Sequence, residues 1–410
     1  MSKLPSSYGL ASHALHAGEL EGDAQHSHVA PIYQTSTFSF ADVAHGQALF
    51  SGEQEGNIYT RWGNPTIRAL EQKIAALEAH DLRRNGGPEL PLAGMAFSSG
   101  MGAISSLLLT LLRPGDTLLT HGGLYGGTDE LMAKVLTDLG IITVVLDLND
   151  TPALERAIAA AQRPRVVYIE SPANPALQMT DIAQVASLAH QHGLQVITDN
   201  TFATPILQQP LALGADFVIH STTKYLNGHG TTVGGMVVAR DAEFVRGDLW
   251  TRMKLLGTSP SPFDAWLINQ GIKTLALRMQ QHCANAQAVA EWLSGQAKVD
   301  AVHYPGLPDF PQHELARRQM KGFGGMVAFE LKGGLEAGAG MMNRVRLATL
   351  AVSLGVVDTL IQHPASMTHV MIPTQQRRAN GISDGLVRLS VGIEEAADII
   401  DDLDQALNGA

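Results

Sequence analysis

The stretch from Gln195 to Lys224 reads QVITDNTFATPILQQPLALGADFVIHSTTK and contains two short apolar runs, each ending in polar residues. The first run ends at Asp199, and the second leads into Ser221. Short apolar runs bounded in this way are typical of buried strands, and the amphipathic segments around them are typical of helices. The stretch therefore predicts an α/β fold with a mostly parallel sheet, in which these polar residues lie beyond the carboxyl ends of strands.

A lysine beside hydroxyl groups, with a carboxylate on a neighbouring strand, is the set that pyridoxal 5'-phosphate (PLP) requires. The lysine forms a Schiff base, the hydroxyls hold the phosphate, and the carboxylate keeps the pyridine nitrogen protonated. Lys224, Ser221, Thr223 and Asp199 supply these groups. A lone lysine after a strand is usually solvated, but the uncharged neighbours and the glycine-rich run LNGHG at 226–230 suit a confined site, where burial lowers a lysine pKa. These residues favour a PLP enzyme.

Composition narrows the class of protein. With 410 residues, 45% of them hydrophobic and 16% charged, the chain is long enough for two or more domains with large cores. The net charge of −11 disfavours nucleic acid and anionic membranes as partners. Cys283 is the only cysteine, which excludes an intrachain disulfide and indicates a reducing compartment. Without a signal-peptide core or a membrane-length apolar run, we expect a cytoplasmic protein.

The chain divides into three parts by pattern. Residues 1–72 form a non-periodic arm, expected to pack on another subunit, and a polar loop is expected at 81–92. A helix is expected at 66–79, across the first boundary. An α/β domain at 73–270 has expected helices at 100–112, 129–139, 152–161 and 182–192, with strands at 117–120, 142–146, 166–169, 195–198, 217–220 and 235–239. A smaller α+β domain at 271–410 has expected helices at 272–294, 338–347 and 396–407, with strands at 299–303, 326–331 and 386–391.

The segment Ser99-Gly100-Met101-Gly102-Ala103 precedes an apolar helix. Free amides at a helix N-terminus bind phosphate, and glycine lets the backbone approach it. Taken alone, the segment is more often a glycine helix cap, but Ser221 and Lys224 strengthen the phosphate interpretation. It is neither a dinucleotide-binding fingerprint nor a P-loop.

Other residues allow two interpretations. Tyr125 follows an expected strand and could stack on a flat cofactor and transfer protons, or it could pack as a loop tyrosine. Arg388 lies inside an apolar strand, where it needs an anion. That anion could be a substrate carboxylate or an internal Asp or Glu. Tyr59 and Arg61 lie in the arm, where an ordinary surface position is the default.

Two further patterns are rejected. The arm contains five histidines without the spacing of a tight ligand pair, so no metal site is expected: His13, His16, His26, His28 and His45. Ser221-Thr222-Thr223-Lys224 fits the S-x-x-K of serine β-lactamases, but the accompanying S-D-N and K-T-G motifs have no proper match.

Taken together, the motifs resemble the Cys/Met-metabolism family of PLP enzymes, the group around cystathionine γ-lyase, and within it most of all the methionine γ-lyases. The resemblance covers nearly the whole chain. Its pieces are PIYQTSTF at 31–38, GEQ at 52–54, ESPANP at 170–175, the run 221–230, HPASMTH at 363–369 and GLVRLSVG at 385–392. The resemblance implies PLP fold type I, which is aspartate-aminotransferase-like, and a homotetramer of two active dimers.

The resemblance also implies roles for individual residues. Lys224 carries PLP and then moves protons, while Tyr125 stacks on the ring and assists the leaving group. Asp199 pairs with the pyridine nitrogen, and Asn174 contacts the ring oxygen. The phosphate is bound by one set of groups, the last two of them from the neighbouring subunit: Gly100, Met101, Ser221, Thr223, Tyr59 and Arg61. Arg388, Asn174 and the backbone near Ser353 bind the substrate.

The implied reaction is α,γ-elimination, with methionine as the first substrate expected. Val352 stands where cystathionine-handling members usually carry glutamate, which favours methionine γ-lyase or acylhomoserine sulfhydrylase. Gly127 stands where methionine γ-lyases often have cysteine, and Leu255 where they tend to have aspartate. Cystathionine γ-lyase or homocysteine desulfhydrase activity, O-acylhomoserine sulfhydrylase activity and a non-catalytic PLP-binding protein therefore remain alternatives.

Overall fold

The computed structural model describes residues 4–5, 7–19, 26–84, 92–368, 370–371, 374–379 and 381–409. Its larger part is built on a seven-stranded sheet with the order β1-β7-β6-β5-β4-β2-β3. The strands are β1 (Ala93–Phe97), β2 (Thr117–Thr120), β3 (Ile142–Val145), β4 (Pro164–Glu170), β5 (Gln195–Asp199), β6 (Phe217–His220) and β7 (Gly235–Ala239). Only β7 is antiparallel to its neighbours, β1 and β6, so the mostly parallel sheet is confirmed.

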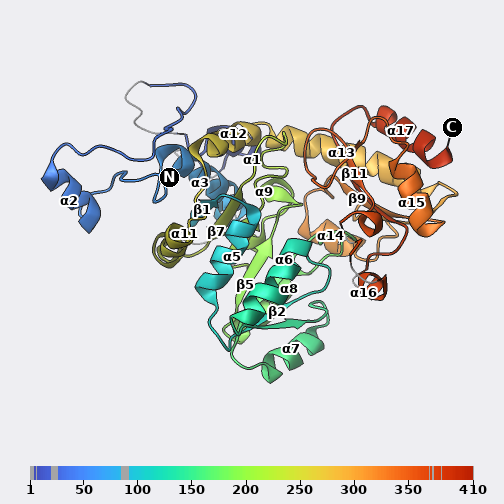
Figure 1. Ribbon diagram of the computed structural model, residues 1–410, viewed down its shortest axis with the longest axis horizontal. Coiled ribbons are helices and arrows are strands. Elements are labelled where there is room, and N and C mark those ends of the chain that lie inside the picture. The colour runs from blue at the N-terminus through green and yellow to red at the C-terminus, as the bar shows by residue number, and fades with distance from the viewer. Residues whose placement is uncertain are drawn as a thin grey trace.

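Helices cover both faces of this sheet (Figure 1). One face packs on α5 (Gly100–Leu111), η1 (Leu131–Leu136), η3 (Val245–Leu249) and α11 (Trp250–Leu256). The other face packs on α7 (Thr151–Ala160) and α8 (Ile182–Gln191). Short elements complete this part: α4 (His80–Arg84), α6 (Gly126–Glu130), α9 (Thr204–Leu207), η2 (Pro210–Leu213) and α10 (Ala242–Phe244). The sheet is therefore buried, as continuous apolar strands require.

Several of these helices begin at a side chain that caps the free backbone amides. Ser99 accepts a hydrogen bond from Gly102 N at the start of α5, and Asp181 accepts one from Gln184 N at the start of α8. Asn64 caps α3 (Pro65–Glu78), which also has proline at its first position. Such caps stabilise a helix start by about 1 kcal/mol, and proline is pre-organised there.

The C-terminal part contains a five-stranded sheet with the order β10-β11-β12-β9-β8. Its strands are β8 (Val299–His303), β9 (Met326–Leu331), β10 (Thr349–Leu350), β11 (Leu360–Gln362) and β12 (Leu386–Ser390). Its helices are α12 (Pro262–Ile272), α13 (Leu275–Ser294), α14 (His313–Gln319), α15 (Gly334–Met342), η4 (Pro364–Ser366), α16 (Thr374–Ala379) and α17 (Ala396–Asn408). The expected α+β character is confirmed, and one apolar core joins this part to α3 and β6.

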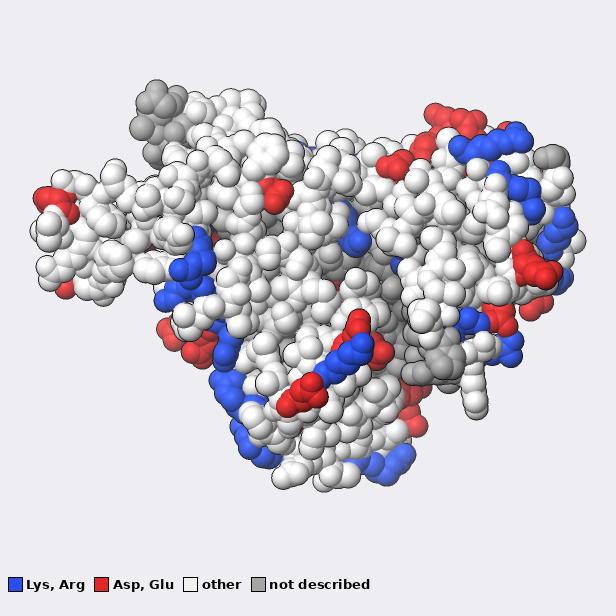
Figure 2. Space-filling model, in the orientation of Figure 1, with Lys and Arg blue, Asp and Glu red and all other residues white. Residues whose placement is uncertain are grey.

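The N-terminal region behaves as two different pieces. Helix α1 (Leu10–His16) packs into the core, and the buried Lys73 amine donates hydrogen bonds to the carbonyls of Ala14 and Leu15. Helix α2 (Val43–Ser51) instead projects from the body (Figure 1) and is mostly uncharged on the face that Figure 2 shows. Val43 is 88% exposed. The projecting piece therefore has apolar surface that no described part of this chain covers.

Most expected elements are confirmed within one or two residues, including the strands at 117–120, 217–220, 235–239, 299–303 and 326–331. The expected helix at 338–347 is shifted, since α15 spans Gly334–Met342. Helix α12 was not expected, because its buried residues point to both α3 and α13 and leave no single apolar face. The polar loop expected at 81–92 begins with α4, and residues 85–91 lie outside the described residues.

The predicted domain boundaries fall within helices. Helix α3 continues past residue 72, and α12 continues past residue 270. The three-part division therefore stays a prediction. No described helix combines the length and apolar character needed to cross a bilayer.

Candidate active site

Three chemically important side chains lie at the carboxyl edge of the main sheet. Glu170 ends β4, Asp199 ends β5, and Lys224 follows the end of β6 by a few residues. Because β4 and β5 are parallel and in register, Glu170 lies directly beside Asp199. The carboxyl ends of parallel strands are where α/β proteins bind ligands. The sheet therefore gathers Asp199 and Lys224, as the sequence predicted, and adds a second carboxyl group.

Lys224 is half-buried, and its Nζ donates a hydrogen bond to Ser353 Oγ at 3.0 Å. Burial, and then the positive charge of Arg388, lower the pKa of Lys224 to about 8. An amine with such a pKa is a better nucleophile near neutral pH than an ordinary lysine, because a much larger fraction of it is unprotonated than at the usual pKa of about 10.4. Lys224 therefore has the environment of an imine-forming lysine.

Arg388 lies on β12 and is only 5% exposed. Its guanidinium donates to Asn174 Oδ1 at 3.0 Å, to Val352 O at 3.1 Å and to Ser353 O at 3.0 Å. Burial lowers the pKa of Arg388 to about 10. Within the described part of the chain, Arg388 makes no ion pair, and none of its hydrogen bonds is to a carboxylate. Its charge is thus compensated by oxygen dipoles alone, which suits an anionic ligand.

Tyr125 and Asn174 are joined by the carboxyl group of Glu170. Glu170 Oε2 accepts from Tyr125 N at 2.8 Å, and Oε1 accepts from Asn174 N at 3.1 Å. The Tyr125 side chain is 49% exposed, so its ring is not enclosed by this chain. Hydrogen bonds therefore run without a break from Tyr125 through Glu170, Asn174 and Arg388 to the Ser353 backbone, and the Ser353 side chain bonds Lys224.

Asp199 is buried and is held in place by local donors. Its Oδ1 accepts from Thr201 N at 3.0 Å, and the Tyr168 hydroxyl donates to Oδ2 at 3.4 Å. Burial raises the pKa of Asp199. A buried carboxyl group of this kind favours a cationic partner, which a protonated pyridine nitrogen would be.

A buried group of three polar residues lies under the strand ends. Glu78, near the end of α3, accepts from His220 Nε2 at 2.6 Å and from Asn200 Nδ2 at 3.0 Å, and all three residues are fully buried. His220 ends β6 and Asn200 follows β5. Glu78 therefore connects the end of β6, which leads to Lys224, with Asn200, which directly follows Asp199 at the end of β5.

The start of α5 lies against Ser221. A Cβ added to Gly100 would lie 2.9 Å from Ser221 Cβ and 3.1 Å from Ser221 Oγ, so only glycine allows this approach. Ser99 occupies the Gly102 amide, and among the described residues no acceptor bonds the amides of Gly100 or Met101. Ser99 is thus a helix cap, and two amides remain for an anion.

Thr223 belongs to the same region. Its hydroxyl accepts a hydrogen bond from Gly234 N at 3.0 Å, which fixes the turn that precedes Lys224. The structure therefore brings together the four residues predicted to bind phosphate from this chain: Gly100, Met101, Ser221 and Thr223.

Tyr59 and Arg61 lie elsewhere. Arg61 Nη1 donates to Lys254 O at 2.6 Å, and its guanidinium lies 5.5 Å from the Tyr59 ring centre. Both side chains are exposed. In the described part of this chain, Arg61 contacts α11 and Tyr59, and Tyr59 also pairs with Thr37 and lies against Trp62. No hydrogen bond or ring contact among the described residues joins either side chain to Ser221 or Lys224.

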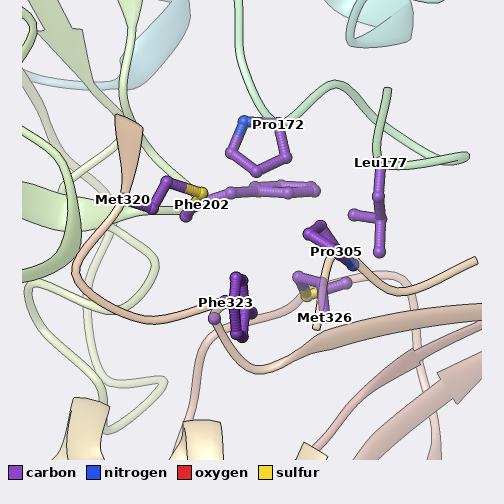
Figure 3. A pocket seen from close by; sticks show the side chains of 8 residues that line it. Pro172, Leu177, Phe202, Pro305, Met320, Phe323 and Met326 are labelled. Carbon is purple, nitrogen blue, oxygen red and sulfur yellow. The ribbon is translucent and has the colours of Figure 1, made fainter. Parts of the chain in front are cut away.

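A small apolar pocket lies apart from these residues. Pro172, Leu177 and Phe202 line it from one side, and residues of the C-terminal part from the other: Pro305, Met320, Phe323, Gly324 and Met326 (Figure 3). None of the predicted site residues lines it. Among the described residues, no group of histidine, cysteine and acidic side chains has an arrangement that could hold a metal ion.

The side chains fit PLP. Lys224 offers an amine of lowered pKa, Asp199 a buried carboxyl group, and the start of α5 two amides beside the Ser221 hydroxyl. No role was predicted from the sequence for Glu170 or His121. In the structure, His121 Nε2 accepts a hydrogen bond from Glu170 N at 2.9 Å. The signal for Glu170 was present, since a glutamate ends the apolar run VVYI.

Comparison with known proteins also indicates a PLP enzyme. The family model described as "Cys/Met metabolism PLP-dependent enzyme" matches residues 11–408. The L-methionine γ-lyase of Pseudomonas putida is 49% identical over 100% of this chain and 99% of its own length. The cystathionine γ-synthase of Mycobacterium leprae is 44% identical over 98% of this chain and 97% of its own.

Solved structures agree with the sequence relatives. The crystal structure of cystathionine γ-synthase from Xanthomonas oryzae pv. oryzae, in complex with aminoacrylate and cysteine, has a TM-score of 0.89 and 43% identity, covering 99% of this chain and 98% of that one. The expected fold type I, the PLP cofactor and carbon–sulfur lyase chemistry are therefore established for this protein. The chain belongs to the Cys/Met-metabolism family of PLP-dependent enzymes.

Proposed function

We propose that the protein cleaves L-methionine by α,γ-elimination, giving methanethiol, 2-oxobutanoate and ammonia with the uptake of one water. Similarity to methionine γ-lyases and cystathionine γ-synthases supports γ-elimination or γ-replacement on an amino acid. The choice of methionine rests on Val352. It lies in the loop whose backbone carbonyl accepts from Arg388, and its side chain is 61% exposed. An apolar surface there suits a methylthio group better than the charged second half of cystathionine.

In this proposal Arg388 binds the substrate carboxylate, with Asn174 and the Ser353 backbone holding the guanidinium in place. The buried guanidinium can bind both carboxylate oxygens, which fixes the position of the amino acid. The amide groups of Gly100 and Met101 and the hydroxyls of Ser221 and Thr223 hold the cofactor phosphate. Asp199 pairs with the cofactor nitrogen, and Asn174 also contacts the ring oxygen.

Lys224 and Tyr125 move the protons. PLP, when bound, draws electrons from the carbon that bears the amino group. The Lys224 amine would accept the proton from that carbon, release it to the bound substrate and cofactor, and so be free to accept one from the next carbon, which its lowered pKa allows. The Tyr125 hydroxyl donates a proton to the departing sulfur, and its exposed ring covers the cofactor. Hydrolysis then releases the oxo acid and ammonia.

Gly127 supports a second candidate, cystathionine γ-lyase or homocysteine desulfhydrase. A Cβ at Gly127 would lie 2.7 Å from Tyr125 Cε1 and 3.1 Å from Met101 Sδ, so a cysteine there would displace the tyrosine ring. The tyrosine ring thus takes the space that a cysteine would need. Similarity to cystathionine γ-synthases also keeps O-acylhomoserine sulfhydrylase activity as a candidate.

We further propose that the arm completes a neighbouring subunit's site. Tyr59 and Arg61 would reach the partner's cofactor phosphate, and the exposed apolar surface of α2 would be covered on assembly. The arm at 1–72, the PLP-binding part at 73–270 and the C-terminal part at 271–410 would then assemble as a homotetramer of two active dimers. A cytoplasmic location remains our prediction.

Product analysis tests the proposal. Purified protein with its visible-absorbing cofactor is offered L-methionine, L-cystathionine, L-homocysteine, and O-acetylhomoserine with sulfide in parallel. We expect methanethiol and 2-oxobutanoate from methionine as the dominant products. No product from methionine, with turnover of another substrate, would reject methionine γ-lyase activity and make Gly127 more informative than Val352.

A further inference from the structure

Glu170 is a buried acidic residue that the proposed reaction does not use. It is 5% exposed, and its two carboxyl oxygens accept hydrogen bonds from two different loops. One loop follows β2 and presents Tyr125, and the other follows β4 and presents Asn174. A single side chain thus sets the spacing between two residues that would touch the cofactor from different strands.

The backbone of Glu170 is fixed as well. Glu170 N donates to His121 Nε2 at 2.9 Å, and His121 Nδ1 donates to Gly122 O at 2.7 Å. Burial lowers the pKa of His121, so its ring is neutral and can accept at Nε2. The turn from His121 to Tyr125 is therefore anchored to Glu170 at two points, one through its amide and one through its carboxyl group.

The hydrogen bonds from Glu170 continue through Asn174 to Arg388, the residue proposed to bind the substrate carboxylate. Asn174, whose amide is held by Glu170, accepts from Arg388 Nη1 at 3.0 Å through its side chain. A displacement of Glu170 would thus move Tyr125 directly and Arg388 through Asn174. Misplacement of reacting groups by even about 1 Å can cost roughly 100-fold in rate.

We propose that Glu170 is a positioning residue that locks Tyr125 and the Asn174–Arg388 pair into one rigid unit across the active site. This inference rests on the proposed function for the identity of the substrate that Arg388 binds. The positioning of Tyr125 and Asn174 against the cofactor does not depend on that identity. The carboxyl group acts by accepting two amides at once. Neither glutamine, with one acceptor oxygen, nor aspartate, with a shorter side chain, can replace it.

The test compares Glu170→Gln and Glu170→Asp with Glu71→Gln. Glu71 is a suitable control because its Oε1 also accepts a backbone amide, from Ala96 at 2.9 Å, but on α3 outside the site. For each holoenzyme we would measure bound PLP, the visible circular dichroism of the cofactor, thermal stability, and kcat and KM on the best wild-type substrate. The single variant Asn174→Ala and the double variant Glu170→Gln/Asn174→Ala complete the set.

We expect both Glu170 variants to bind PLP, to lower kcat/KM by about 10- to 100-fold and to change the cofactor's circular dichroism. Glu71→Gln should stay within about 2-fold of wild type. Adding Asn174→Ala to Glu170→Gln should cost much less than the product of the two single effects, as expected for residues that act as a unit.

Unchanged circular dichroism in both Glu170 variants, or multiplicative effects in the double variant, would overturn the inference. Equal losses in the Glu170 and Glu71 variants would do so too, because they would mean a general stability effect. The circular dichroism does not require turnover. If methionine is not the substrate, the proposed function fails while this measurement still decides the role of Glu170.

Discussion

The carboxyl edge of the sheet and the projecting arm are two halves of one proposed site, but they are built very differently. At the sheet edge, Tyr125, Glu170, Asn174, Arg388 and Lys224 are connected by hydrogen bonds within this chain. In the arm, Tyr59 and Arg61 are exposed, and they contact each other, other arm residues and α11. The sheet edge is therefore complete in geometry before a partner arrives, and the arm is not.

The difference follows from the residues that support each half. Buried polar groups need partners and so become rigid networks, as with Glu78, His220 and Asn200. The arm around α2 has apolar residues at its surface, such as Val43 and Phe50, and few buried groups to hold it. Changes at the sheet edge should thus affect chemistry or stability of one chain, while changes in the arm should act across an interface.

The largest effect is expected at the sheet edge. Lys224→Ala removes the amine that binds the cofactor and moves protons, and should lower kcat/KM by about 10⁴-fold or more. The variant should keep its fold, since Lys224 is only half-buried and bonds one side chain, Ser353. Steady-state kinetics and thermal unfolding measure the two properties. A Lys224→Ala variant with full activity would revive the non-catalytic interpretation.

The buried support under the strand ends gives the next largest effect. Glu78→Ala leaves His220 Nε2 without its acceptor and removes one of the two acceptors of Asn200 Nδ2. A buried donor left without a partner costs about 1–3 kcal/mol. We expect a clearly lower thermal midpoint and weaker PLP retention. The control is Glu155→Ala, an exposed residue of α7, which should change neither. Equal thermal midpoints for the two variants would contradict a supporting role for Glu78.

A smaller effect is expected in the arm. Arg61→Ala should raise the Kd for PLP by about 10-fold, the loss expected for one charge-assisted contact to phosphate, and leave chain stability unchanged. Arg68→Ala is the matched control, because Arg68 is exposed nearby on α3. Equilibrium dialysis with PLP measures both.

Mixing two defective chains sharpens this prediction. When Arg61→Ala and Lys224→Ala chains are co-expressed, random pairing gives about a quarter of the sites an intact set of residues, if the arm serves the partner. At a limiting PLP concentration, where sites that lack Arg61 stay largely empty, activity should then reappear at that level. No recovery, with mixed oligomers present, would mean that Arg61 serves its own chain.

The smallest effect is a shift in pH dependence. The pKa of Lys224 is lowered to about 8 by burial and by Arg388, so its amine is protonated below that pH and free above it. The rate at which the protein without cofactor binds PLP should therefore rise with pH through about 8 and then level off. Arg388→Met removes a positive charge and should move this midpoint to higher pH. Stopped-flow absorbance measures the midpoint, and a shift to lower pH would contradict the assigned cause.

Much of the sheet and the sheet-edge half of the site could be predicted from the sequence. Strands such as 217–220 are short, apolar and bounded by polar residues, so their positions follow from local pattern. Asp199 and Lys224 could be placed because such residues at strand ends meet at one edge. Helix α12 could not, since it is buried on several sides and lacks one apolar face.

The contacts between residues far apart in the sequence could not be predicted either. Glu170 accepts a hydrogen bond from the backbone amide of Tyr125, and Glu78 of α3 accepts one from His220. Both contacts join residues far apart in the sequence, so they depend on the tertiary fold. The partner of Arg388 was left open between an internal carboxylate and a ligand. The described structure surrounds it with the oxygens of Asn174, Val352 and Ser353, which no local pattern indicates.

One measurement tests the central claim that Lys224 carries the cofactor. The protein with bound PLP is treated with borohydride, which fixes the cofactor to its lysine, and the digested chain is mapped by mass spectrometry. We expect one pyridoxyl group per chain on Lys224, whose amine has the lowered pKa at the carboxyl edge of the sheet. A label on another lysine, or none while the visible absorbance is present, would contradict it.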